Sequence, residues 1–333
     1  MTSGVFEDFT DLEALEREAS SSDPQRRRIA VLSAVDSGEP SALLLLRGLV
    51  GDTDPHVRRQ VALALGTFDG AEAADGLVHL LRDDDPVVAS AAAQSLAELK
   101  DTGAAPVIIG ALDDPRPFVR ASLLCGLKEL RAPGSWPAAL EALQDDDASV
   151  RVQAVAVIGY LKREEAVPAL RAAARDEVLA VRRAAISALV FSSAAGAVET
   201  IVGGLQDPEW LVRESAAEAV GSTQGSVDTR PLLQALDDAY WQVRLKAVRS
   251  LGLLECGDAA GRIAESLRHP EPNLRKEAAA ALGRLARPET RADLERSAAD
   301  PDADVRKNVH LALARIEAAW LKANLDGEHQ NDA

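Results

Sequence analysis

Apolar side chains recur along this chain at helical spacing, in blocks that repeat at a constant interval. Within a block such as residues 57–66 or 274–283, small and apolar residues follow the three- and four-residue steps of a buried helix face. An apolar residue followed by arginine starts each block, and neighbouring starts such as 181 and 212 are 31 residues apart. The pairs are Val57-Arg58, Val119-Arg120, Val150-Arg151, Val181-Arg182, Val212-Arg213, Val243-Arg244, Leu274-Arg275 and Val305-Arg306.

A column of aspartates precedes these arginines by six residues. Its members are Asp52, Asp83, Asp114, Asp145, Asp176, Asp207, Asp238 and Asp300. Ser21 and His269 replace the aspartate in two further copies, Ala89 replaces the arginine in one, and Arg27 marks a degenerate first copy. Self-similarity at such a period indicates a repeat architecture, and the pattern predicts ten copies without an insertion.

Each copy is predicted to be a pair of helices. Pro106, Pro137 and Pro168 suit the first position of a first helix, where no amide partner is needed. Asp-Pro steps such as Asp54-Pro55 then separate it from a second helix, which the aspartate can cap. Small residues recur on the inner face of the second helix, and glycines end it in register: Ala154, Ala185, Ala216, Ala247 and Ala278, then Gly66, Gly159, Gly221, Gly252 and Gly283.

One such hairpin cannot bury its own apolar face, so stability must come from stacking on its neighbours. The sequence therefore predicts an all-α solenoid over residues 21–318. A capping box at residues 10–13 predicts a capping helix within residues 1–20, and residues 319–333 form a polar C-terminal tail. Such a stack is expected to be a curved body whose concave surface is long enough to hold a protein partner.

The Asp-Pro, Val-Arg and Ala-Leu-Gly steps resemble the HEAT-repeat family, and within it the phycobilin-lyase-type subgroup, over roughly residues 21–318. The resemblance implies a right-handed α-α superhelix of two-helix repeats. It also implies that each aspartate and the arginine six residues later belong to a structural ladder that ties each turn to its neighbour. Asp52 with Arg58, and Asp207 with Arg213, are expected to serve this purpose.

Composition and charge narrow the class of partner. The formal net charge is −16, so the average field repels phosphate backbones and anionic lipid, and we expect neither nucleic acid nor a membrane as partner. No signal sequence or long apolar run is evident, which favours a cytoplasmic protein. Cys125 and Cys256 are far apart in sequence and indicate neither a disulfide framework nor a zinc site.

Catalytic chemistry has little support. Relatives with this repeat, the deoxyhypusine hydroxylases, bind two irons through His-Glu pairs, but none of the five histidines here is followed by glutamate. These histidines occupy unrelated repeat positions or the tail: His56, His79, His269, His310 and His329. We therefore expect no catalytic residues, no metal and no cofactor, and an enzyme is the less favoured class.

Function is expected where the copies differ, on the outward columns of the second helices in copies five to nine. The candidate partner-binding residues are Tyr160, Arg183, Phe191, Trp210, Glu214, Glu218, Trp241, Lys246, Arg249 and Arg284. Aromatic residues commonly anchor protein interfaces. A positive run of Arg183, Lys246, Arg249, Lys276 and Arg284 would suit an acidic segment of a partner.

Two alternatives stay open for these residues. Trp210 and Trp241 occupy the same column of consecutive copies, and they are either exposed anchors or local core under the neighbouring turns. The positive run is either a partner site or a solvated helix face, because Glu214, Glu218 and Glu277 interrupt it. The favoured function is a protein-binding scaffold or adaptor. The alternative is a phycobilin lyase-like, chromophore-handling protein or enzyme subunit.

Overall fold

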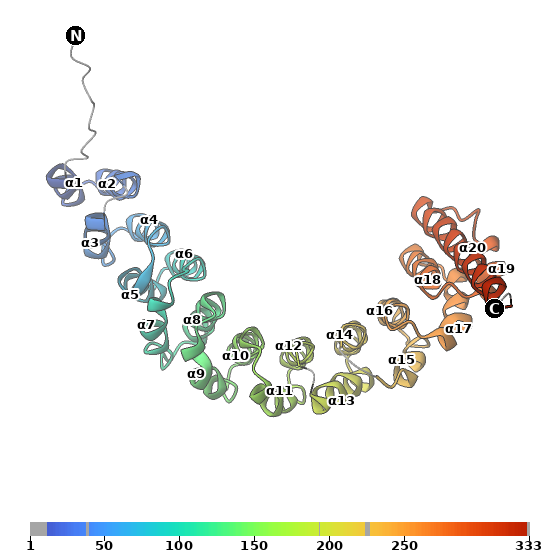
Figure 1. The fold of residues 1–333 in the computed structure, drawn as a ribbon. Coiled ribbons are helices and arrows are strands. Elements are labelled where there is room, and N and C mark those ends of the chain that lie inside the picture. The colour runs from blue at the N-terminus through green and yellow to red at the C-terminus, as the bar shows by residue number, and fades with distance from the viewer. Residues whose placement is uncertain (1–11, 38–39, 193, 224–226, 332–333) are drawn as a thin grey trace, which may run out of the picture. The chain divides into compact units, whose positions relative to one another are not determined.

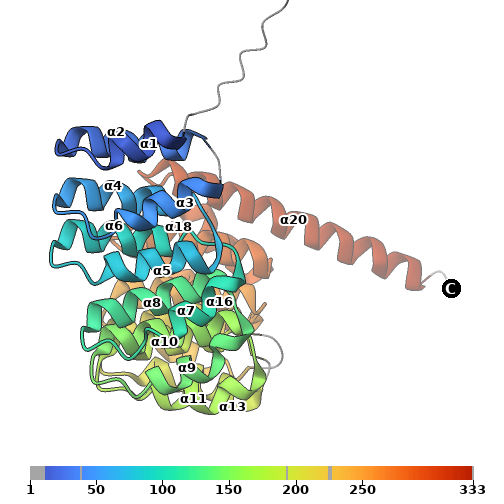
Figure 2. The ribbon, with the colours of Figure 1, turned by 90° about the vertical axis from the view of Figure 1, so that its left-hand side faces the viewer.

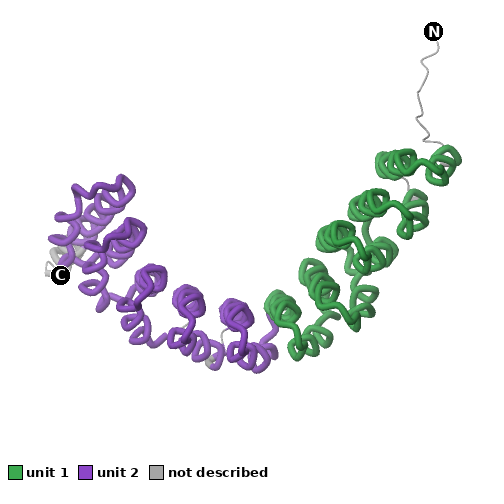
Figure 3. Tube along the Cα trace, turned by 180° about the vertical axis from the view of Figure 1, so that it is seen from behind, with its two compact units in different colours: residues 1–161 green, residues 162–333 purple. Residues whose placement is uncertain are grey.

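The computed structural model describes residues 12–37, 40–192, 194–223 and 227–331, and every regular element within these ranges is a helix. The chain divides into two compact units, residues 1–161 and residues 162–333 (Figure 3). The capping box expected to start at Thr10 begins outside the described residues, but the helix expected after it is present as α1 (Leu12–Ala19).

The helices alternate between a first and a second helix of each copy. The first helices are α1, α3 (Pro40–Gly48), α5 (Gly70–Leu81), α7 (Ala105–Ile109), α9 (Trp136–Ala142), α11 (Val167–Ala173), α13 (Ala195–Gly203), α15 (Arg230–Ala235), α17 (Ala260–Glu265) and α19 (Arg291–Arg296). The second helices are α2 (Pro24–Ser37), α4 (Pro55–Leu65), α6 (Pro86–Leu96), α8 (Pro117–Leu130), α10 (Ala148–Leu161), α12 (Leu179–Leu189), α14 (Trp210–Val220), α16 (Trp241–Leu253), α18 (Pro272–Leu285) and α20 (Ala303–Asn331).

The second helices keep the predicted interval throughout. Their first residues are 24, 55, 86, 117, 148, 179, 210, 241, 272 and 303, each 31 after the last. Apart from α5, each first helix is shorter than the second helix of its copy, and several adjoin a 3₁₀ turn. These turns are η1 (Thr102–Ala104), η2 (Pro133–Ser135), η3 (Glu164–Ala166), η4 (Gly204–Gln206), η5 (Gly257–Ala259), η6 (Ser266–Arg268) and η7 (Pro288–Thr290). The predicted all-helical solenoid with a 31-residue period is therefore confirmed.

Within each unit the first helices form one row and the second helices another (Figure 1). The apolar columns face the space between the rows, where Leu123, Leu124 and Leu127 of α8 are fully buried, as are Ala216 and Ala217 of α14. A short hairpin could not cover these side chains by itself, so each copy depends on the next one for burial. Figure 2 shows the successive second helices α4, α6 and α8 of unit 1 stacked in parallel layers.

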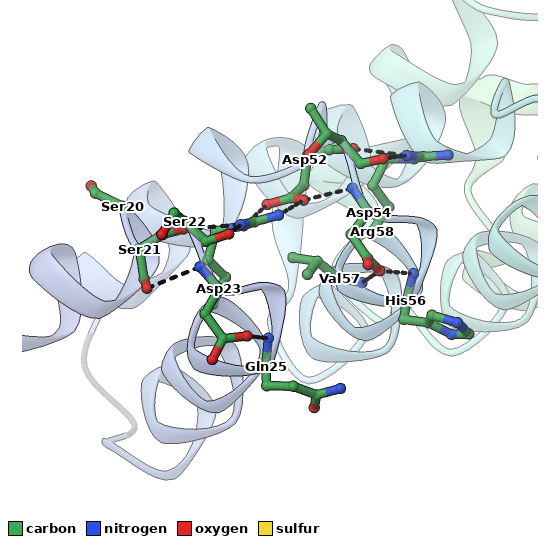
Figure 4. Close-up of polar contacts among 12 residues, drawn as sticks. Ser20, Ser21, Ser22, Asp23, Gln25, Asp52, Asp54, His56, Val57 and Arg58 are labelled. Atoms are coloured by element: carbon green, nitrogen blue, oxygen red, sulfur yellow. Dashed lines mark hydrogen bonds and ion pairs between the residues drawn. The ribbon is translucent and has the colours of Figure 1, made fainter.

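Aspartate and proline together start the second helices α4 and α6, as the sequence predicts. The side chain of Asp54 accepts hydrogen bonds from the amides of His56, at 2.7 Å, and Val57, at 3.3 Å, while Pro55 is the first helical residue (Figure 4). The capping oxygen satisfies amides that have no partner inside the helix, and proline has no amide to satisfy. The same arrangement begins α6 at Asp85.

The ladder of aspartates and arginines is present, but it runs between copies. Arg58 donates through Nη1 to the backbone carbonyl of Asp52, at 2.7 Å, and through Nε and Nη2 to the carboxylate of Asp83, at 2.5 and 2.9 Å. The carboxylate of Asp52 itself receives Arg27 of the preceding copy. Arg58 thus holds its own turn through a backbone carbonyl and the following turn through a carboxylate. The same bidentate pairing joins Arg120 to Asp145, Arg182 to Asp207, Arg213 to Asp238 and Arg275 to Asp300.

In the copy that has Ala89 in place of the ladder arginine, two arginines from other columns bind the next aspartate. That aspartate is Asp114, which has no ladder arginine to pair with because residue 89 is alanine. Asp114 is only 5% exposed. Arg116 donates to both of its carboxylate oxygens, at 2.8 and 2.9 Å, and Arg82 donates to one of them at 2.9 Å. These bonds, those from Arg116 first, hold the pKa of Asp114 far below its ordinary value. The repeated columns did not predict these two contacts, because neither arginine lies in the repeated arginine column.

The ladder carboxylates should make stability depend on acid pH. Hydrogen bonds from Arg120 lower the pKa of Asp145 below its ordinary value of 3.8, and those from Arg275 do the same for Asp300. For Asp238 burial opposes the shift, but the bonds from Arg213 and the turn amide outweigh it. Carboxyl groups with a lowered folded pKa stabilise the fold above their unfolded pKa, and this contribution is lost as the pH falls through the folded pKa.

We therefore expect the free energy of unfolding to fall as the pH is lowered from about 5 towards 2. Urea unfolding followed by circular dichroism at several pH values in this range measures it. The net charge of −16 acts in the opposite direction, since protonation relieves repulsion among the acidic residues. A midpoint that rose steadily below pH 4 would show that repulsion, and not the ladder, dominates.

The C-terminal helix extends further than expected. The sequence predicts a polar tail from residue 319, but α20 continues as a helix to Asn331 (Figure 2). Leu311, Trp320 and Leu321 are exposed on it. At the other end α1 packs against α2 and buries Leu15, so it serves as the first helix of the first copy as well as its cover.

Candidate functional site

The predicted partner-binding residues fall into both units. Tyr160 lies in α10 of unit 1, and the other nine lie in unit 2, on or next to second helices. We define the second-helix face of unit 2 as the outward side chains of α12, α14, α16 and α18. The predicted residues on it or at its edges are Arg183, Phe191, Trp210, Glu214, Glu218, Trp241, Lys246, Arg249 and Arg284.

Three basic residues of this face are joined to acidic ones across three helices. Lys246 of α16 bonds Glu218 of α14 at 2.6 Å, and Arg249 lies 4.0 Å from the same carboxylate. Arg249 also bonds Glu277 of α18 at 2.8 Å. Arg284 lies 3.6 Å from that glutamate. Three cations and two carboxylates therefore form one network, and the positive run largely carries its own counter-charges.

Glu277 has a larger role in this network than its sequence position indicated. It interrupts the positive run in sequence, yet it is only 7% exposed and lies between Arg249 and Arg284. A buried carboxylate is stable only when it is paired and hydrogen-bonded. The hydrogen bond to Glu277 also raises the pKa of Arg249. This pairing makes Arg249 a structural residue as well as a candidate contact.

Trp210 packs on the turn of the next copy. Its ring stacks on that of Tyr240, with centroids 5.1 Å apart and planes 10° apart, and the guanidinium of Arg213 lies 5.9 Å from the Tyr240 centroid. Trp210 and Trp241 are both half-buried, whereas Tyr240 is 44% exposed. Between the two interpretations of Trp210, this geometry favours local packing, and it leaves Tyr240 as the more accessible ring.

Tyr160 and Phe191 are exposed rings with cations above them. In unit 1 Arg131 and Lys128 lie 5.1 and 5.9 Å from the Tyr160 centroid, and Tyr160 is 43% exposed. In unit 2 Lys162 lies 4.6 Å from the Phe191 centroid, and Phe191 is 59% exposed. Contacts between a cation and an aromatic face favour a fixed ring orientation. An exposed, oriented ring is suited to contact a partner.

Arg183 and Glu214 complete the face. The guanidinium of Arg183 donates to Ser215 Oγ at 3.1 Å, which orients it towards α14, and Glu214 is half-buried beside that serine. Ser215 and the three cations over the rings of Tyr160 and Phe191 were not among the residues predicted from sequence. Ser215 and Lys128 have no counterpart of the same kind in the neighbouring copies. Arg131 and Lys162, in contrast, are 31 residues apart, as are Tyr160 and Phe191, so the sequence held a periodic signal for these two contacts.

The described residues hold no group of three or more histidine, cysteine or carboxylate side chains placed to bind a metal ion. Among the helices of the described ranges, none combines the length and the apolar character needed to cross a membrane. The two cysteines are both half-buried, free thiols.

Solved structures with a similar fold include two longer proteins and one of similar extent. A structure of Kap95p with RanGDP matches 91% of this chain and 50% of that chain at 14% identity, with a TM-score of 0.63. Importin beta matches 92% of this chain and 46% of that one at 16% identity and a TM-score of 0.55. The E. coli protein YibA matches 73% of this chain and 92% of its own at 19% identity, with a TM-score of 0.58. At these identities the likeness concerns the fold alone.

No curated protein matches the chain significantly. The model for HEAT repeats, in contrast, matches residues 12–97, 74–147, 136–221 and 229–314, which together span most of the chain. Its matches cover both units and agree with the helix pairs and the inter-copy ladder. The chain therefore belongs to the HEAT-repeat family.

Proposed function

We propose that this protein is a scaffold or adaptor that holds a partner protein on the second-helix face of unit 2. One observation carries the proposal: the inward columns of these helices recur from copy to copy, while the outward columns differ in size, charge and aromaticity. Packing and the ladder account for the recurrent columns. They do not account for an exposed ring at Phe191 or for the different charges at Arg183 and Glu214.

A long row of second helices suits a protein partner better than a small molecule. The structure with RanGDP that resembles this fold contains a second protein, which supports the class of partner without identifying it. The charge network changes the expected recognition. Because Glu218 and Glu277 already pair with Lys246, Arg249 and Arg284, a partner is expected to bring both acidic and basic side chains rather than an acidic segment alone.

Affinity capture from extract of the native cells, followed by mass spectrometry, tests this proposal. The test variant carries Phe191→Ala and Glu214→Lys, because both side chains lie on the face and neither belongs to the ladder or the charge network. The control is Glu199→Lys, an exposed charge reversal on the first helix α13. We expect the test variant to lose its captured partner about tenfold or more, as for loss of an interface anchor, and the control to keep it. Equal capture by both variants would exclude this face.

The alternative is a chromophore-handling protein of the phycobilin-lyase type. The observation in its favour is that Cys125 of α8 is a free thiol that is only half-buried. Adding bilin to the purified protein and to a Cys125→Ser variant separates the two functions. A covalent adduct, seen by absorbance and mass spectrometry only when Cys125 is present, would favour the alternative.

A further inference from the structure

The ladder contains one position where the acceptor has been replaced, at His269. Where the pair is complete the aspartate has two tasks, because its carboxylate accepts both the amide two residues later and the ladder arginine of the preceding copy. Asp238 does both, accepting the amide of Tyr240 at 2.9 Å and Arg213 through both oxygens. A carboxylate has about four acceptor positions and can do this easily.

A neutral histidine cannot do both, because its ring has a single acceptor nitrogen. Nδ1 of His269 accepts the amide of Glu271 at 3.0 Å and thereby keeps the turn. Its proton must then be on Nε2, which lies 2.9 Å from Nη2 of Arg244. Burial, followed by the neighbouring charge of Arg244, lowers the pKa of His269, so the ring is neutral at pH 7. Two donors therefore face each other where the other copies have a charged pair.

Arg244 therefore finds fewer hydrogen-bond acceptors than the arginines of the complete pairs. Its Nε is buried and has no hydrogen-bond partner among the described residues. Arg58 and Arg213 each donate to a turn carbonyl six residues earlier, but no such bond from Arg244 is present within the described ranges. Nε and Nη2 form the edge with which the ladder arginines bind carboxylates. At Arg244 that edge lacks its anion.

A hollow of about 420 Å³ lies beside this edge, between the first helices α15 and α17 and the turn that holds His269. Arg244, Arg262, Arg268 and His269 line it together with Asp237 and Glu265. Asp237 is bound by Arg262 at 2.7 Å, and neither acidic residue bonds Arg244 in the described part of the chain. Arg120 and Asp145 line a comparable hollow in unit 1, but there the pair is complete.

From these contacts we infer that the hollow at Arg244 and His269 binds an oxyanion supplied from outside the ladder, either a carboxylate or a phosphate group. The anion lies in the hollow beside His269, which occupies the position of the missing aspartate, and it accepts hydrogen bonds from the guanidinium of Arg244 and from Nε2 of His269. Charge-assisted bonds to a guanidinium edge are the strongest that such a group can form in a protein. The hollow opens beside the first helices, so this inference does not depend on the proposed partner face.

Nuclear magnetic resonance of the ¹⁵N-labelled full chain tests it. The Nε–H signal of Arg244 is assigned by its loss in Arg244→Lys, and sodium phosphate and sodium acetate are then titrated separately at pH 7 and constant ionic strength. We expect a saturable shift of this signal with at least one anion, and a His269 ring protonated at Nε2. The anion that produces the shift identifies its chemical source. The Nε–H signal of Arg213, whose pair is complete, is the internal control and should not move.

The variant His269→Asp restores the carboxylate and should be at least as stable as the natural chain. In it the Arg244 signal should respond to the anion about tenfold more weakly or not at all, because the introduced carboxylate occupies the edge. The inference is wrong if neither anion shifts the Arg244 signal in the natural chain. It is equally wrong if the natural chain and His269→Asp respond alike, or if Arg213 shifts as much as Arg244.

Discussion

Replacing Arg213 by alanine should cost about 3 to 5 kcal/mol of folding free energy, as expected when one partner of a buried ion pair is removed. Arg213 donates two hydrogen bonds to the carboxylate of Asp238, at 2.6 and 3.0 Å, and two to the carbonyls of Asp207 and Pro208. The side chains of Arg213 and Asp238 are 16% and 10% exposed. The variant leaves a carboxylate partly buried without its counter-charge. Urea unfolding measures the loss in total stability.

The control is an exposed pair of the same chemistry. Nε of Arg291 and Oε1 of Glu295 are 2.8 Å apart in α19, but the two side chains are 54% and 53% exposed, so Arg291→Ala should leave the free energy of unfolding almost unchanged. Adding Asp238→Asn to Arg213→Ala should recover part of the loss, because no charge then stays buried. Hydrogen exchange should localise the damage to α14 and α16, since repeat stacks open locally. Equal costs for Arg213→Ala and Arg291→Ala would mean that the ladder is not a stability element.

The fold was predictable because its information is periodic. Burial, the small residues, Asp54-Pro55 and the aspartate column all repeat, so ten weak signals reinforce one another. Which copy each ladder arginine pairs with was harder to predict from the sequence. An arginine six residues after an aspartate can meet it within one copy or reach the next copy, and sequence spacing alone does not distinguish these. The structure shows both, through the backbone carbonyl in one case and the carboxylate in the other.

The candidate site was less predictable because it consists of departures from the period. Outward columns could be identified, but not the pairing between Arg249 and Glu277, which depends on side chains 28 residues apart on neighbouring helices. The repair of Asp114 by Arg82 and Arg116 also uses residues from outside the repeated columns. His269 was visible as an exception to the aspartate column. Its consequence for Arg244 required knowing which nitrogen faces which donor.

Replacing Gly221 by alanine is the other change with a large expected effect. Gly221 follows α14 with φ of −68°, an ordinary conformation, so helix termination does not require glycine here as the periodic glycines had suggested. Close packing does. A Cβ at this position would lie 2.7 Å from the Cβ and 2.8 Å from the backbone Cα of Ser250, and it would also collide with Ser250 Oγ. Ser250 is fully buried and donates to the carbonyl of Ala217 at 2.6 Å.

Because the obstacle includes backbone, α14 and α16 must separate or shift to admit the methyl group. Overpacking of this kind costs about 1 to 3 kcal/mol or more, and urea unfolding should show the loss. Gly261 in α17 is the matched control, since nothing lies within 4 Å of its added Cβ. There alanine should stabilise by about 0.5 to 1 kcal/mol through helix propensity. If Gly221→Ala also stabilised, the second helices would have to tolerate a wider spacing than their contacts show. Combining Gly221→Ala with Ser250→Gly removes the side-chain part of the clash, so its cost should be less than the sum of the two single changes.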